Sequence, residues 1–386
     1  MRRNLDVVLA SVSEATHAGQ WSPTDVRRQV APDFDLMSRQ AICELTGTGF
    51  GALSSSGSAA LRYGLEALGV GWGDVVAIPS STWIAVPEAV LSVGARPLLI
   101  PTDEVGNMRL DCMPEALAGH SPRAAIVVHS NGIPADVGEV RRILPDWCRV
   151  LEDFSQAHGA SVEGRPVGSL GDAGACSFHA TKLIACGEGG AFVSDDEDLV
   201  HRFGALTTNG RAPRPPQIGR LDYEPRDNDS LVGSNARLSA FGSAVLHAQL
   251  GGYGEYVEAC WNGWERIASA LHDSPMESLQ TTVSGSVPYC LPLRARPQQG
   301  ERAARVLAEL QAHGYAKPAT RCLHELSERA FDRPSLRWFR DDLLYRQFGI
   351  GECRLCASST TFFVPHTHLA DDRAVDAIAR VIRSQR

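Results

Sequence analysis

Among the 37 lysine and arginine residues of this sequence, only two are lysines, Lys182 and Lys317. Arginine keeps its charge in proteins, whereas lysine can lose a proton and attack a carbonyl carbon. Lys182 ends the stretch Ser-Phe-His-Ala-Thr-Lys at residues 177–182 and is followed by glycine-rich residues 187–190. Lys317 lies in residues 314–318, where we expect a solvated loop after a helix. Lys182 is therefore the candidate for covalent chemistry.

An acidic side chain stands at the end of an apolar run before Lys182. Residues 149–154 predict a strand, and Asp153 lies near its carboxyl end. Ligands of α/β proteins gather at such strand ends. The alternative is that Asp153 only caps the next turn, as a lone acid in this position often does.

A turn of small residues precedes a predicted helix. Residues 54–61 read Ser-Ser-Ser-Gly-Ser-Ala-Ala-Leu, so a strand runs into a turn that opens a helix. Free backbone N–H groups at the positive end of a helix favour a phosphate. The same residues are also a common helix cap, and the Gly-Lys-Ser/Thr of a P-loop is absent.

An amine, an acid and a phosphate cradle at one sheet edge are the requirements of pyridoxal phosphate (PLP). Lys182 would form the Schiff base, Asp153 would keep the ring nitrogen protonated, and residues 56–58 would bind the ester phosphate. Trp83 follows another predicted strand at the start of a helix. Its ring either stacks on the flat cofactor or packs in the core.

These residues need a sheet to position them. Short β-branched runs alternate with helix-like segments from residue 51 to about 195, which predicts an α/β domain with a mostly parallel sheet. The expected strands are residues 51–55, 75–79, 97–100, 124–129, 149–154, 175–179 and 190–194. Helices are expected over residues 58–68, with Leu61, Leu65 and Leu68 on one face, and over residues 137–144.

The second half of the chain predicts a smaller domain. Residues 208–232 read as a long loop, of a length that is often functional. A strand is expected at residues 287–293, and helices at 236–250, 253–272, 301–313 and 371–385. We place a large domain at residues 1–250, and a connecting helix with a small C-terminal α+β domain at residues 251–386.

Composition narrows the class of protein. A length of 386 residues, with 44% hydrophobic and 21% charged residues, is typical of a globular protein with a large and a small domain. A net charge of -8 argues against a nucleic-acid partner. The longest apolar stretches are strand-sized, and the N-terminus lacks the apolar core of a secretory signal. We expect a cytoplasmic protein with no membrane partner.

The ten cysteines have no framework spacing, and we expect buried, reduced thiols. Cys353 and Cys356 have the C-x-x-C spacing of metal and redox sites. A zinc site would need two further ligands at a similar spacing, and no second C-x-x-C exists. We therefore expect no metal.

The chain resembles the DegT/DnrJ/StrS family of sugar and cyclitol aminotransferases, within fold type I of the PLP enzymes. The resemblance covers about residues 35–260 and returns near residues 363–366. Its most specific part is Glu-Asp at 152–153, Gln-Ala-His-Gly-Ala at 156–160, Gly-Ser-Leu-Gly-Asp-Ala-Gly at 168–174, Ser-Phe-His at 177–179, Lys182 and Gly-Glu-Gly-Gly at 187–190. Residues 57–61, 68–70, 73–75 and 232–239 also match.

The resemblance implies a seven-stranded mostly parallel sheet and a role for each site residue. Lys182 would be the Schiff-base lysine and general acid/base, and Asp153 would pair with the pyridinium nitrogen. Gln156 would contact the phenolic oxygen of the ring, and Trp83 would stack on it.

The resemblance also implies which residues hold the phosphate. Gly57, Ser58 and Ser177 would bind it. Asn235 would reach it from the neighbouring subunit, so the active unit would be a homodimer with shared sites.

Four positions depart from the family pattern. Ser58 stands where the family usually has Thr, a change that keeps a hydroxyl. Asn131 replaces an aromatic residue, Ala240 a glutamate and Gly242 a glutamine. In the family these positions lie near the substrate or the dimer interface, so they bear on the acceptor rather than on the cofactor.

The implied reaction moves an amino group from Gln or Glu to a ketone on a cyclitol or sugar, in natural-product biosynthesis of the aminoglycoside type. Residues 82–85 and 233–235 favour a cyclitol. A nucleotide-linked keto-sugar would favour basic groups, which Arg211, Arg214 and Arg220 could supply from the long loop. The same cofactor site could instead serve a dehydration or related step, although family members that dehydrate typically lose the lysine. A regulatory ligand sensor on this fold is the third possibility.

Overall fold

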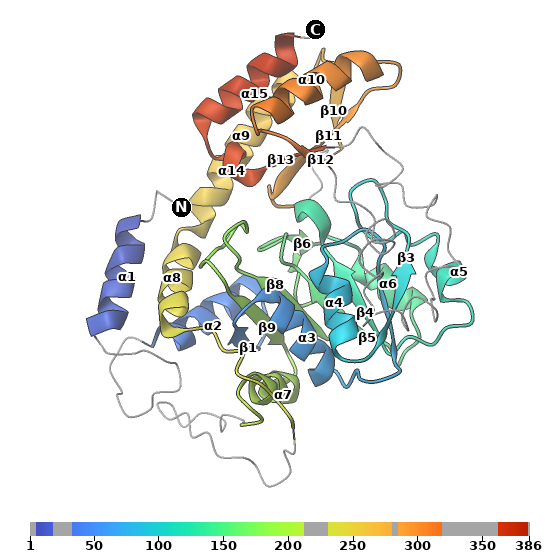
Figure 1. Cartoon of the computed structure of the whole chain (residues 1–386), viewed down its shortest axis with the longest axis vertical. Coiled ribbons are helices and arrows are strands. Elements are labelled where there is room, and N and C mark those ends of the chain that lie inside the picture. The colour runs from blue at the N-terminus through green and yellow to red at the C-terminus, as the bar shows by residue number, and fades with distance from the viewer. Residues whose placement is uncertain (1–4, 18–32, 212–230, 280–284, 319–361, 385–386) are drawn as a thin grey trace, which may run out of the picture.

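The computed structural model describes residues 5–17, 33–211, 231–279, 285–318 and 362–384. Its centre is a seven-stranded sheet with the strand order β1-β9-β8-β5-β4-β2-β3 (Figure 1). The strands are β1 (Phe50–Ser54), β2 (Val75–Pro79), β3 (Arg96–Ile100), β4 (Ala124–Val128), β5 (Arg149–Asp153), β8 (Ala173–Ser177) and β9 (Gly190–Ser194). Only β9 runs against its neighbours in this sheet. The predicted fold class and all seven strands are confirmed.

Successive apolar residues of the strands point to opposite faces of the sheet, and helices cover both faces. In β2, Val76 and Ile78 point to one core, and Val75 and Ala77 point to the other. The first core packs beneath α3 (Gly57–Ala67), α4 (Ala85–Ser92) and α7 (Glu197–Thr207), and the second beneath α5 (Met113–Leu117) and α6 (Val137–Ile143). Strands buried on both faces read as continuous apolar runs, which is why the sequence located them so well.

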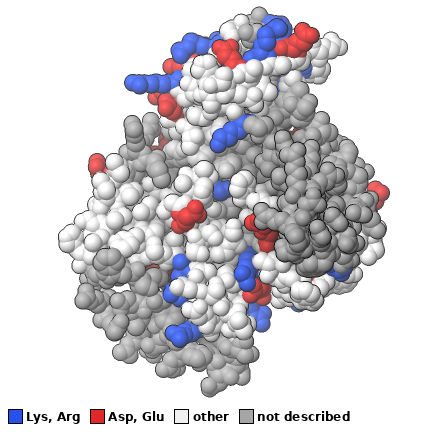
Figure 2. Space-filling view, in the orientation of Figure 1, with Lys and Arg blue, Asp and Glu red and all other residues white. Residues whose placement is uncertain are grey.

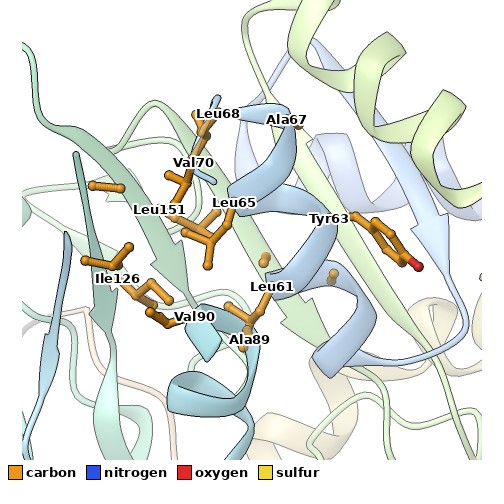
Figure 3. Close-up of a cluster of buried hydrophobic side chains, with 14 of the residues drawn as sticks. Leu61, Tyr63, Leu65, Ala67, Leu68, Val70, Ala89, Val90, Ile126 and Leu151 are labelled. Atoms are coloured by element: carbon orange, nitrogen blue, oxygen red, sulfur yellow. The ribbon is translucent and has the colours of Figure 1, made fainter. Parts of the chain in front are cut away.

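Helix α3 packs onto the sheet through the face that the leucine spacing predicted. Leu61, Leu65 and Leu68 all belong to the first core, together with Ile126 and Leu151 of the strands beneath (Figure 3). The helix therefore stands firmly on the sheet with its N-terminus at the carboxyl ends of the strands, where the candidate site lies.

A second, antiparallel sheet has the order β10-β11-β13-β12. Its strands are β10 (Met276–Ser278), β11 (Cys290–Ala295), β12 (Lys317–Pro318) and β13 (Phe362–Pro365). The long helix α9 (Tyr253–Ala270), with α10 (Gly300–Ala312), α14 (His366–Leu369) and α15 (Asp372–Ser384), shares a separate apolar core with these strands (Figure 1). The sheet and these helices form the α+β part that the sequence predicted for the C-terminal third.

Several predicted boundaries were wrong for identifiable reasons. The strand expected at 287–293 begins at Cys290, because the Val287 N–H donates to the carbonyl of Gly132 instead of to the ladder. The helix expected from residue 236 begins only at Ala240, as α8 (Ala240–Gly251), because the Ala236 carbonyl accepts from Ser55 N–H. Lys317 is exposed as expected, but it lies in β12 and not in a loop.

The other boundary differences are small. Strand β8 ends at Ser177 rather than at residue 179, because Phe178 N–H donates to the Gly189 carbonyl outside the ladder. The helices predicted over 58–68, 137–144, 253–272, 301–313 and 371–385 are present with ends shifted by one or two residues. Helices α1 (Leu5–His17) and α2 (Phe34–Thr46), which pack on α8, were not predicted, nor was the short hairpin of β6 (Ser161–Val162) and β7 (Arg165–Pro166).

Some predictions lie outside the described residues: most of the 208–232 loop with Arg214 and Arg220, and the pair Cys353 and Cys356. Of the described cysteines, Cys148, Cys176, Cys260 and Cys290 are buried thiols. Within the described ranges no cluster of His, Cys, Asp and Glu could hold a metal ion, and no helix is long and apolar enough to cross a membrane. On the face seen in Figure 2, the acidic and basic side chains of the described residues are intermixed rather than gathered by sign.

Candidate active site

The carboxyl ends of the parallel strands meet at one edge of the large sheet, and the candidate residues follow them. Strand β1 ends at Ser54, β5 at Asp153 and β8 at Ser177. Because β9 is antiparallel, it begins at the same edge, and Gly190 pairs with both Ser54 and Ser177. The register thus brings segments far apart in the sequence into one row.

Two glycines let backbone segments approach closely in this row. A Cβ atom on Gly190 would lie 2.4 Å from the Ser56 carbonyl oxygen, and one on Gly57 would lie 2.5 Å from Ser177 Cβ. Neither position has room for a side chain. The N-terminus of α3 is therefore packed directly against the end of β8.

The same helix end has the N–H groups that an anion needs. Ser56 caps α3, because its Oγ accepts from Ala59 N–H at 3.2 Å. The first two helical N–H groups, those of Gly57 and Ser58, have no acceptor inside the helix and stand at its positive end. Ser58 is exposed, and Ser177 lies beside Gly57. The three residues predicted to hold a phosphate thus lie together at the start of α3, where Gly57 packs against Ser177; we call this group the cradle.

Asp153 ends β5 and Lys182 follows the end of β8, at the same edge of the sheet. The Asp153 side chain is buried at the end of β5, and its Oδ1 accepts from Ser155 N–H at 3.0 Å, which is the turn contact expected of a strand-end acid. Burial lowers the pKa of Lys182, and the negative charge of Asp153 acts in the opposite direction. The acid and the amine therefore interact, and both the turn contact and the proposed pairing with a ligand are compatible with this geometry.

Lys182 stands in the loop between β8 and β9 and has an aromatic neighbour that sequence reasoning missed. Its Nζ lies 5.5 Å from the ring centroid of Tyr289, which directly precedes β11. Tyr289 was part of a predicted strand, and nothing in its local sequence marks it as a site residue. Its position depends on the docking of the second sheet against the first.

Gln156 is held in one orientation by a backbone contact. Its Oε1 accepts from the N–H of Asn131 at 2.7 Å. A backbone N–H can only donate, so the amide oxygen must face it, and the NH₂ group remains to donate elsewhere.

Asn131 itself is fully engaged with the protein. It adopts a left-handed backbone with φ 59°, a region that Asn tolerates. Its Nδ2 donates to the Val105 carbonyl at 2.7 Å, and its Oδ1 accepts from the Cys290 thiol at 3.2 Å. The departure from the family's aromatic residue therefore has a structural role here.

Trp83 and Asn235 are both exposed. Trp83 is 63% exposed just before α4, so the alternative that it packs in the core is wrong. Asn235 forms a bridge with Thr208, and the next residue, Ala236, accepts from Ser55 N–H at 2.7 Å. Asn235 thus lies beside the segment that leads into the cradle of its own chain.

Glu152, the residue before Asp153, lies at the centre of a buried hydrogen-bonded cluster. Glu152 is fully buried and accepts from His129 Nε2–H at 2.9 Å and from the N–H groups of Gly168, Leu170 and Gly171 at 2.7–2.9 Å. His129 Nδ1 accepts from Ala135 N–H at 3.0 Å. Burial opposes ionisation of Glu152, but the bond from His129 and the loop N–H groups outweigh it and lower its pKa. Sequence reasoning included Glu152 in the family motif but gave it no role.

The chain belongs to the DegT/DnrJ/EryC1/StrS aminotransferase family, whose model matches residues 36–321. This membership confirms the predicted family and the predicted enzyme class, an aminotransferase.

Among individual proteins, the chain is 32% identical to an L-glutamine:scyllo-inosose aminotransferase of Streptomyces griseus, over 98% of this chain and 92% of that protein. It is 35% identical to an L-glutamine:2-deoxy-scyllo-inosose aminotransferase of Streptomyces fradiae, over 63% of this chain and 57% of the relative. The predicted reaction class, transfer of an amino group to a cyclitol or sugar ketone, agrees with the names of these relatives.

Solved structures share the fold. A 3-amino-5-hydroxybenzoic acid synthase superposes with a TM-score of 0.80 and 23% identity, over 98% of this chain and 96% of that one. A DegT DnrJ EryC1 StrS aminotransferase from Brucella abortus superposes with a TM-score of 0.77 and 22% identity, over 99% and 96%. At these identities the likeness supports the fold alone.

The Glu152 cluster generates a stability prediction. We expect Glu152→Gln to lower the free energy of unfolding by about 2–4 kcal/mol, because an amide nitrogen would face groups that now donate to a carboxylate. Urea unfolding at neutral pH measures this. Glu255→Gln, at an exposed position of α9, is the matched control and should change stability by less than about 0.5 kcal/mol.

The same pair gives a pH dependence. Because the folded-state pKa of Glu152 is below its ordinary value of 4.5, the stability it contributes is present above that value and is lost as pH falls through the folded-state pKa. The difference in unfolding free energy between wild type and Glu152→Gln should therefore shrink on acidification below about pH 4. A difference that grows in acid would contradict the role given to the carboxylate.

Proposed function

We propose that this aminotransferase uses PLP to move the amino group of L-glutamine to the ketone of a cyclitol of the scyllo-inosose type. The observation that carries the proposal is the match to the S. griseus enzyme, which extends over 98% of this chain and 92% of the relative. The row of Asp153, Ser177 and Lys182 beside the N-terminus of α3 supplies matching chemistry.

The residues present fit PLP. The absence of a Cβ at Gly57 lets the start of α3 pack directly against Ser177, and the N–H groups at this helix terminus suit the ester phosphate. A relative of the same fold from Streptococcus pneumoniae, with a TM-score of 0.79 and 19% identity over 98% of this chain and 96% of that one, has been solved in its PLP form. When bound, PLP supplies an electron sink for carbanion chemistry.

Each ring contact follows from what the side chains can donate or accept. Asp153 would face the pyridine nitrogen and hold its proton, because a buried carboxylate stabilises a neighbouring positive charge. Gln156, whose oxygen is already held by Asn131, would donate its NH₂ to the phenolic oxygen. Trp83 would cover the ring, which would bury an indole that is now exposed.

Lys182 would attach the cofactor covalently and then move a proton. Burial lowers the pKa of its amine, which raises the fraction of neutral lysine near pH 7. A neutral Nζ could take the proton from the α-carbon of the amino donor and return it to C4′ of the cofactor, so that one amine would act as both general base and general acid.

We further propose a cytoplasmic homodimer without nucleic-acid or membrane partners. The exposed Asn235 would reach the phosphate of the neighbouring subunit. We place the division between the large domain and the small domain at residues 250 and 251, at the last residue of α8 and two residues before α9 begins.

Lysine chemistry can be tested directly. In Lys182→Arg the positive charge remains but no covalent link can form, so borohydride should fix no cofactor and turnover should fall by at least about a thousandfold. Mass spectrometry of the reduced wild-type protein locates the modified residue. Lys317→Arg is the matched control and should behave as wild type; attachment at any residue other than Lys182 would refute the assignment.

The proposed phosphate site can be tested by adding one methyl group at Gly57. Gly57→Ala should weaken PLP binding by at least about tenfold, because the new Cβ would displace Ser177 or the end of α3 and cost charge-assisted hydrogen bonds to the phosphate. Equilibrium dialysis measures this. Gly71→Ala, where a Cβ meets nothing within 4 Å, should bind PLP normally. Equal affinity in the two variants would show that the phosphate lies elsewhere.

Kinetics with two ketone substrates distinguish a cyclitol acceptor from a nucleotide-sugar acceptor. With L-glutamine as donor, we expect kcat/KM for scyllo-inosose or its 2-deoxy form to exceed that for a nucleotide-linked keto-sugar by about a hundredfold, since binding sites discriminate strongly through hydroxyl contacts. L-glutamate in place of L-glutamine tests the donor. A preference for the nucleotide sugar would favour the alternative in which arginines such as Arg211 hold its phosphates.

A further inference from the structure

His366, at the start of α14, joins the second sheet to the residue that precedes Lys182. Its side chain is buried, and both ring nitrogens have partners. Nε2 lies 2.9 Å from the carbonyl oxygen of Thr181, and Nδ1 lies 2.7 Å from the hydroxyl of Tyr256 on α9. A contact between residues 185 positions apart thus ends next to the candidate catalytic lysine.

The partners determine the protonation state of the ring. The Thr181 carbonyl can only accept, so Nε2 carries the hydrogen and donates it. Burial lowers the pKa of His366 to about 4 and raises that of Tyr256, so both groups are neutral near pH 7. Nδ1 then has a free lone pair and accepts from the Tyr256 hydroxyl. This second bond holds the ring in the orientation in which Nε2 donates to Thr181.

The bond to Thr181 acts on Lys182 through a rigid unit. The Thr181 carbonyl and the Lys182 N–H belong to one planar peptide group. His366 holds the oxygen of this group, and the His179 carbonyl accepts from its N–H at 2.9 Å. With both ends held, the peptide plane is fixed, and with it the position of the Lys182 Cα atom from which the side chain leaves the backbone.

His366 also supports the aromatic ring that faces the amine. The His366 ring centroid lies 5.5 Å from that of Tyr289, and the two rings are tilted by 31°. The backbone N–H of His366 donates to the Tyr289 carbonyl at 2.9 Å. Tyr289 in turn lies 5.5 Å from Lys182 Nζ. His366 therefore restrains Lys182 from two directions, through the backbone and through this ring.

We propose that His366 is a positioning residue for Lys182, supplied by the segment that follows β13 of the second sheet and held in its orientation by the hydrogen bond to Tyr256. The proposal rests on the proposed function in that it takes Lys182 as the cofactor-binding amine. It assigns His366 no contact with the cofactor or with substrate.

The chain offers a matched set of variants. His366→Phe removes both ring nitrogens but keeps a planar ring, and His366→Gln keeps a donor that can reach Thr181. Tyr256→Phe keeps the His366 ring but removes the hydrogen bond to Nδ1 that helps to orient it. His368→Phe is the control, because His368 lies on the same helix and its Nε2 contacts a backbone carbonyl, that of Gly314 at 3.1 Å, away from the lysine loop.

Two measurements test the proposal. In the cofactor-free protein, His366→Phe should speed amide hydrogen exchange at residues 180–186 by about tenfold, since one restraint on this loop is lost. On addition of PLP, it should slow covalent capture by Lys182, followed by borohydride trapping, by about tenfold, yet leave the affinity for inorganic phosphate within about twofold. His366→Gln should recover most of both effects, and Tyr256→Phe should show smaller shifts in the same direction.

Several results would overturn the proposal. One is a His366→Phe variant that matches His368→Phe in exchange and capture. Another is faster exchange with unchanged capture, which would leave His366 a structural role only. If His366→Phe does not fold, Tyr256→Phe decides, and normal exchange and capture in that variant refute the proposal. If borohydride fixes the cofactor away from Lys182 in wild type, the proposed function fails, and with it the claim that His366 positions a cofactor-binding lysine. The exchange data distinguish this case, because they report the contact of His366 with the loop at residues 180–186 whether or not Lys182 binds the cofactor.

Discussion

The buried carboxylate of Glu152 is the contact on which the rest of this site depends. A charge in a protein interior is tolerated only when hydrogen-bond donors surround it, and here His129 and three loop N–H groups do so. Because Glu152 precedes Asp153 in the central strand β5, the same donors fix the strand end that carries the second acid. One charge thereby ties together the end of β4, the loop at residues 168–171 and the base of the active site.

Much of the large domain could be predicted because its signals are local. Buried strands such as β2 and β9 are continuous apolar runs, and the leucine spacing of α3 records the face that it buries. Lys182, Asp153 and Gly57 also lie in short motifs whose chemistry can be read from neighbouring letters. What could not be predicted depends on contacts between distant segments. The N-terminal shift of α8 follows from one bond between Ser55 and Ala236, which no local pattern reveals.

The residues that sequence reasoning missed share this origin. Tyr289 lies just before β11 and His366 just after β13, so both reach Lys182 only when the second sheet is docked against the first. Asn131 was noticed as a departure from the family, but its function was not apparent. In the structure both polar ends of its side chain are bonded to the protein, and its N–H orients Gln156. The replacement side chain is thus bonded to Val105 and Cys290, while the backbone N–H of the same residue orients Gln156.

The close contact of Gly57 and Gly190 with the ends of neighbouring segments divides the site into parts that can change at different rates. The proposed phosphate site includes the main-chain N–H groups of Gly57 and Ser58, which substitutions of nearby side chains alter little as long as the glycines remain. Trp83, exposed before α4, and Tyr289, beside Lys182, are by contrast side chains that a single substitution replaces. Substitutions there can therefore change the proposed acceptor preference, among descendants of such a protein or in directed evolution, while the glycine contacts at the proposed phosphate site stay unchanged.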